Sequence, residues 1–83
     1  MPEGQLRVPL CSSAQITAAL RRLGCYPGTA HGGSHRAYHR RRSDGHILTS
    51  PVVLGKREVS RGTLRSILEL LEISLDEFMD ALR

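Results

Sequence analysis

Residues 33–53 read GSHRAYHRRRSDGHILTSPVV, and this stretch decides the fold. Its first part, residues 35–41, is predicted to form one strand, and residues 46–49 are predicted to form the next. Between them lies Asp44-Gly45, a strong β-hairpin signal because both residues tolerate a positive φ. The sequence therefore predicts an antiparallel hairpin in the middle of the chain.

A third, shorter strand is expected before the hairpin, over residues 25–29. Pro27 suits an edge position there, because a proline has no N–H to donate to a strand ladder. Pro51 is expected to end the regular pairing of the last strand, and residues 52–60 are expected to form an exposed connection. Together these segments predict a three-stranded antiparallel sheet.

Helical patterns flank the sheet on both sides. Ser12 and Gln15 match a capping box, and Gly24 is placed to end that helix in a left-handed conformation. After the sheet, residues 64–71 and 74–82 predict either one long kinked helix or two short ones. The apolar positions at helical spacing are Ile16, Ala19, Leu20, Leu23, Leu64, Ile67, Leu68, Leu71, Leu75, Phe78, Met79 and Leu82.

The expected order of elements is α-β-β-β-α, which is also the order of the double-stranded-RNA-binding domain. A chain of 83 residues makes one domain with a thin core. We therefore predict a single α+β domain over residues 1–83, with the helices on one face of the sheet. Residues 1–11 are expected to be a loose lead-in, and residues 12–83 the folded core.

The amino-acid composition indicates where in the cell the protein is expected to be located. No stretch is long and apolar enough to span a membrane, and the N-terminus lacks the apolar run of a secretory signal. The expected location is therefore the cytoplasm, away from membranes. Cys11 and Cys25 agree with this as two free thiols, because a secreted domain of this size usually carries more cysteines. A single bridge between them stays open as the alternative.

Charge is distributed unevenly along the chain. Residues 1–65 carry eleven of the twelve Lys and Arg residues against three acidic ones, whereas residues 66–83 carry one arginine against five acidic residues. A basic body with an acidic C-terminal helix indicates a polyanion-binding surface on one side. The simpler alternative is that the charge only keeps a small protein soluble.

Histidine spacing raises the question of a metal site, because His31, His35 and His39 follow at intervals of four. The glycines Gly32 and Gly33 disfavour a helix there. On a strand, His35 and His39 would lie about 13 Å apart, too far to share one zinc. No cysteine or carboxylate pair completes a ligand set, so we expect neither a metal nor a small-molecule cofactor.

His35 instead fits acid–base chemistry on RNA. It follows a glycine turn at the start of a strand, and an imidazole can take a proton from a ribose 2′-hydroxyl or donate one to a leaving oxygen. Arginines nearby could contact phosphates through paired hydrogen bonds. The residues expected to contact RNA are Gly33, Ser34, Arg36, Arg40, Arg41, Arg42, Lys56, Arg57 and Arg61. Taken alone, these patterns leave His35 open as an ordinary loop histidine.

Several motifs carry a resemblance to a known family. Residues 33–35, GSH, followed by Tyr38, resemble the GSH motif of the HicA (YcfA-like) family. Residues 61–68, RGTLRSIL, resemble that family's GTLRSIL motif almost letter for letter. Residues 73–78, ISLDEF, are similar to its "gis-eeF" ending. The resemblance covers about residues 12–82.

The resemblance implies an endoribonuclease toxin, an mRNA interferase that cleaves mRNA and is neutralised by a HicB-type antitoxin. The family's catalytic histidine falls on His35. Its helix-start motif falls on Gly62 and Thr63, where we expect the glycine to permit a tight entry of the chain into the helix and the threonine to help cap it. The family often has a histidine shortly after the proline of the third strand, but residues 51–54, PVVL, contain none.

Two other functions stay open at this point. One is a non-catalytic RNA-binding module with the same fold, which would bind RNA in a salt-sensitive way without cleaving it. The other is an interaction protein that docks partners on its basic sheet and its acidic last helix. The hypothesis that the protein is a ribonuclease predicts histidine-dependent, metal-independent cleavage of RNA.

Overall fold

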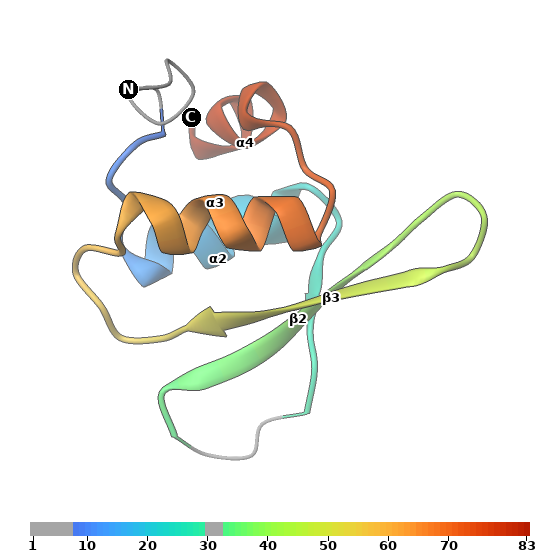
Figure 1. Cartoon of the computed structure of the whole chain (residues 1–83), viewed down its shortest axis with the longest axis horizontal. Coiled ribbons are helices and arrows are strands. Elements are labelled where there is room, and N and C mark those ends of the chain that lie inside the picture. The colour runs from blue at the N-terminus through green and yellow to red at the C-terminus, as the bar shows by residue number, and fades with distance from the viewer. Residues whose placement is uncertain (1–7, 30–32) are drawn as a thin grey trace.

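The computed structural model describes residues 8–29 and 33–83, and Figure 1 shows the whole chain. The elements in order are α2 (Ser13–Arg22), β1 (Tyr26–Pro27), β2 (His35–Arg41), β3 (Ile47–Val53), α3 (Arg61–Leu70) and α4 (Leu75–Leu82). This order confirms the predicted α+β fold with a three-stranded antiparallel sheet. The C-terminal part forms two short helices, one of the two arrangements that the sequence allowed.

The sheet has the order β1-β2-β3, with β2 in the centre. The prediction that Pro51 ends the pairing of β3 is wrong, because Pro51 pairs with Ala37 and the strand continues to Val53. The reason lies in the backbone: the Ala37 carbonyl accepts from the N–H of Gly28 at 2.7 Å, so Ala37 turns its polar groups toward β1. Its opposite residue on β3 then has no ladder bond to donate, and an edge strand tolerates proline there.

Successive side chains of β2 and β3 point to opposite faces of the sheet. Tyr38, Ser50 and Val52 face the helices and are almost completely buried. Figure 1 shows α2 and α3 lying together on that one side of the sheet. The opposite side is called the open face below. Its residues are Tyr26 of β1, His35, Ala37, His39 and Arg41 of β2, and Ile47, Thr49, Pro51 and Val53 of β3.

The segment before α2 also belongs to the core. Val8 and Cys11 are buried, and the N–H of Val59 donates to the Cys11 carbonyl at 2.7 Å. The prediction of an exposed connection over residues 52–60 is correct for residues 55–58 and 60, but Val52 and Val53 belong to β3 and Val59 is buried. Cys11 and Cys25 are both buried free thiols, and burial raises the pKa of each thiol above its ordinary value.

Two helices end in the same hydrogen-bonded turn. At the end of α2, Gly24 has a φ of +87° and the next residue, Cys25, donates back to Leu20 at 2.9 Å. At the end of α3, Glu72 takes the corresponding position with a φ of +54°, and Ile73 donates back to Leu68 at 2.9 Å. A non-glycine residue rarely adopts this conformation, so other contacts must hold Glu72 there.

Arg40 supplies those contacts. Its Nη1 donates to the carbonyl oxygens of Leu71 at 3.1 Å and Glu72 at 2.7 Å, which lie beyond the end of α3. Its Nη2 also lies 3.6 Å from the carboxylate of Glu77 on α4. One arginine of the central strand thus satisfies carbonyls that the helix leaves without partners and ties the α3–α4 turn to the sheet.

We expect Arg40→Met to lower the free energy of unfolding by about 2 kcal/mol, because the substitution removes two hydrogen bonds made by a charged group and one ion pair. Methionine keeps the apolar stem of the side chain. The matched control is Arg41→Met, at an exposed position with no partner among the described residues, which should change stability by less than about 0.5 kcal/mol. Chemical denaturation measures both, and equal losses would contradict the role given to Arg40.

Candidate functional site

His35 is the first residue of β2 and is exposed on the open face. The Oγ of Ser34 lies 3.2 Å from its Nδ1, so this hydrogen bond orients the ring and leaves Nε2 for a ligand. Gly33 has a φ of +84°, a conformation that side-chain-bearing residues rarely adopt. The GSH motif is therefore a turn that requires glycine, followed by a hydroxyl that orients the histidine. His31 and Gly32 lie outside the described residues.

A groove of about 190 Å³ runs from His35 across the free edge of β3 to α3. The residues lining it are His35, Ser50, Pro51, Val53, Thr63, Ser66, Ile67 and Leu70. Val53 is the register partner of His35 and lies within residues 51–54, which follow the family's pattern without its second histidine. Among the residues that line the groove, His35 is the one whose side chain commonly serves as a general acid or base.

Helix α3 forms the far wall of the groove, from Thr63 in its first turn to Leu70 at its end. Ser60 is the N-cap: its Oγ accepts from the N–H of Thr63 at 3.2 Å and donates to the Thr63 hydroxyl at 2.9 Å. Ser60 therefore caps the N–H of Thr63, whereas the sequence predicted that Thr63 itself helps to cap the helix. A Cβ added at Gly62 would meet no atom within 4 Å, and Gly62 does not have a positive φ, so the entry into α3 does not require glycine at this position.

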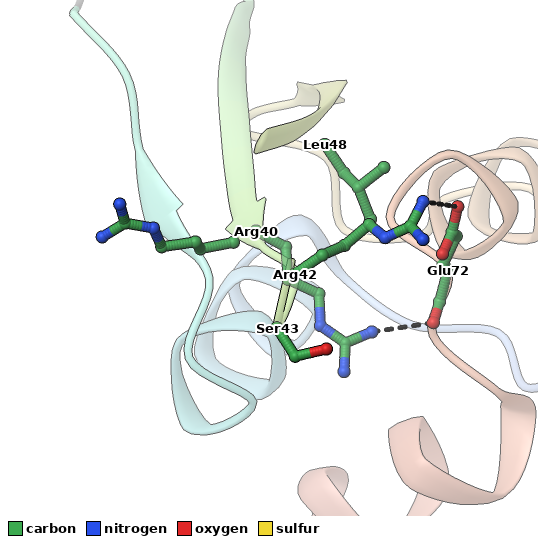
Figure 2. A pocket seen from close by; sticks show the side chains of 6 residues that line it. Arg40, Arg42, Ser43, Leu48 and Glu72 are labelled. Atoms are coloured by element: carbon green, nitrogen blue, oxygen red, sulfur yellow. Dashed lines mark hydrogen bonds and ion pairs between the residues drawn. The ribbon is translucent and has the colours of Figure 1, made fainter. Parts of the chain in front are cut away.

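Three of the arginines expected to contact RNA lie on the helix-facing side of β2 or at its end, bound to protein groups. The Nε of Arg36 donates to the Gly28 carbonyl at 3.2 Å. Arg42 lies 3.2 Å from the carboxylate of Asp44 and 3.6 Å from that of Glu72. Figure 2 shows Arg40 and Arg42 converging on Glu72 in a pocket of about 360 Å³. These side chains therefore carry structural bonds, and RNA contact by them stays a prediction.

The other expected contacts lie in different places. Arg41 shares the open face with His35. Lys56 and Arg57 are exposed beside the start of α2, where the backbone of Lys56 exchanges two hydrogen bonds with Ser13 at 2.9 and 3.0 Å. Arg61 donates from its Nε to the Val8 carbonyl at 2.8 Å and so ties the N-terminal segment to α3. The expected RNA-contacting set is thus spread over several surfaces.

Sequence reasoning treated residues 36–42 as one basic stretch, although the period of two in a strand already separates them. Odd-numbered residues of β2 face solvent and even-numbered ones face the helices. It also missed the cluster around His39. The rings of Tyr26 and His39 lie 5.4 Å apart, and His39 Nδ1 lies 2.9 Å from the Thr49 hydroxyl. A pairing between residues 13 positions apart leaves no local signal in a sequence.

Neither a metal cluster nor a membrane segment is found in the described part of the chain. No three or more His, Cys, Asp or Glu side chains in residues 8–29 and 33–83 gather as metal ligands would. The helices described there are too short or too polar to cross a membrane.

Comparison with protein families gives a match over most of the chain. The model of the HicA toxin of bacterial toxin-antitoxin systems matches residues 13–73, from the first residue of α2 to the turn after α3. A search of curated proteins found no match. The family match includes His35, all three strands and the N-terminal turn of α3, and thus every wall of the groove. Because it spans well over half of the chain, the chain belongs to the HicA toxin family and is a toxin of a toxin–antitoxin system, with an antitoxin as its partner.

Proposed function

We propose that this toxin is an endoribonuclease, an mRNA interferase, in which His35 carries the proton transfers. The observation that carries the proposal is the position of His35. Its imidazole is exposed at one end of a groove, is oriented by Ser34, and shares that groove with side chains of α3 that include Thr63 of the first helical turn. The N-terminal turn of α3 bears a partial positive charge, which suits a phosphate at the Thr63 end of the groove.

The chemistry follows from the groups that the site offers. His35 accepts the proton of a ribose 2′-hydroxyl, and the 2′-oxygen attacks the adjacent phosphorus. The bond from phosphorus to the 5′-oxygen breaks, and that oxygen takes up a proton from the imidazolium or from water. The products are a 2′,3′-cyclic phosphate and a 5′-hydroxyl. A metal ion is not needed in this scheme, because the nucleophile belongs to the substrate itself.

The proposed RNA path runs from the groove along the open face. His35 and Arg41 lie on this face, and the exposed side chains of Lys56 and Arg57 add positive charge on the connection between β3 and α3. The net charge of +4 favours a polyanion overall. The substrate, mRNA, implies that the toxin acts in the cytoplasm. The antitoxin is proposed to be HicB-like and to inhibit by covering His35.

We expect His35→Ala to lower the rate of RNA cleavage by purified protein at least about a hundredfold, because it removes the general acid–base group. Expression of the variant should also no longer arrest growth. His46→Gln is the matched control, because His46 lies in the exposed hairpin turn and should leave cleavage unchanged. Cleavage at the wild-type rate by His35→Ala would refute the assignment. RNA binding by the wild type without any cleavage would favour the non-catalytic module instead.

Metal independence is tested on the same reaction. Cleavage should proceed at an unchanged rate in excess EDTA, since the proposed steps use only the imidazole and the 2′-hydroxyl. The downstream fragments should accept a radioactive phosphate from polynucleotide kinase without phosphatase treatment, because they carry a free 5′-hydroxyl. Loss of cleavage on chelation, or fragments that end in a 5′-phosphate, would refute the proposed chemistry.

A further inference from the structure

The open face carries an aromatic cluster that the proposed cleavage step does not use. Tyr26 of β1 and His39 of β2 are register partners, and their rings lie 5.4 Å apart at an interplanar angle of 44°. Tyr26 is 44% exposed. The hydrophobic core lies on the opposite side of the sheet, among the helices, so these two rings contribute nothing to it.

The ring of His39 is held from several sides. Its Nδ1 lies 2.9 Å from the hydroxyl of Thr49 on β3, and Tyr26 packs against it from β1. On the same side Gly28 approaches so closely that an added Cβ would lie 2.7 Å from His39 Nε2. A side chain at position 28 would therefore displace the ring. The geometry is that of a fixed aromatic surface that faces solvent.

This cluster is aligned with the candidate catalytic residue. His39 lies four residues after His35 on the same strand and the same face, a separation of about 13 Å. Between them this face carries only Ala37 and its partner Pro51, neither of which has a charged or long side chain. Arg41 lies two residues beyond His39, exposed and without a partner among the described residues. A single strand bound at His35 can therefore pass over the rings and reach a free cation.

We infer that Tyr26 and His39 form a base-stacking subsite for a nucleotide of single-stranded RNA that is not adjacent to the cleaved bond, with Arg41 contacting the phosphate beyond it. Proteins bind unpaired RNA by stacking its bases on aromatic side chains and by pairing its phosphates with basic ones. The open face offers both within one stretch of β2. The inference rests on the proposed function, because it assigns the path of the RNA that His35 cleaves.

The test measures binding of a fluorescent single-stranded RNA by fluorescence anisotropy, in the His35→Ala background so that the RNA stays intact. Adding Tyr26→Leu should raise the Kd about tenfold, in line with the loss of one stacked base. Tyr26→Phe keeps the ring and should bind like the His35→Ala protein. Met79→Ala is the matched control, because Met79 is also a partly exposed apolar residue (38%) but lies on α4, in the helical layer.

The salt dependence of RNA binding distinguishes the contribution of base stacking from that of charged contacts. Tyr26→Leu should leave the slope of log Kd against log salt concentration unchanged, whereas Arg41→Met should reduce that slope by about one. A set of oligonucleotides with a single abasic nucleotide locates the subsite. One abasic position should weaken binding as much as Tyr26→Leu does, and the two changes together should weaken it no further.

The outcomes distinguish the two proposals. If wild-type protein cleaves RNA while Tyr26→Leu binds as tightly as its parent, the stacking subsite is refuted and the ribonuclease stands. If Tyr26→Phe binds as weakly as Tyr26→Leu, the ring is not the binding element and the inference is also refuted. If the protein neither cleaves nor binds RNA, the proposed function fails and the subsite fails with it. Unchanged circular dichroism spectra confirm that each variant is folded.

Discussion

Successive side chains of β2 point to opposite faces of the sheet, so that Tyr38 and Arg40 face the helices while His39 and Arg41 face solvent. The rest of the structure depends on this alternation. The inward side chains fill the core and cap the end of α3, and this holds the helical layer against the sheet. The outward side chains are left free for a ligand. Side chains of the single strand β2 therefore contribute both to the packing of the fold and to the candidate RNA-binding surface.

The alternation also determines which of the positively charged side chains remain available to a polyanion. Arg40 and Arg42 bond to the α3–α4 turn, where Glu72 adopts a conformation that is unusual for a non-glycine residue. Acidic side chains of the C-terminal part of the chain partly neutralise the positive charge of these two arginines. The basic and the acidic parts of the sequence therefore contact each other in the folded protein. What remains for a polyanion is a smaller set, including Arg41 and the exposed side chains of Lys56 and Arg57.

Local signals in the sequence predicted most of the fold. The bounds of β2 and the capping box at Ser12 could be predicted because they depend on neighbouring residues. The continuation of β3 through Pro51 could not be predicted in this way, since it depends on the direction in which the backbone N–H and C=O groups of Ala37, opposite Pro51, point. In the candidate site, His35 was predicted from a resemblance to a family, whereas the packing of Tyr26 on His39 arises from strand pairing and has no local signal.

The central claim is that His35 promotes attack by a ribose 2′-oxygen of RNA. It is tested most directly with an RNA oligonucleotide in which the one nucleotide that supplies this oxygen is replaced by its 2′-deoxy form. The account predicts that wild-type protein binds this oligonucleotide with unchanged affinity and no longer cleaves it at that bond. Cleavage of the substituted bond at the normal rate would contradict the account, because the proposed nucleophile would be absent.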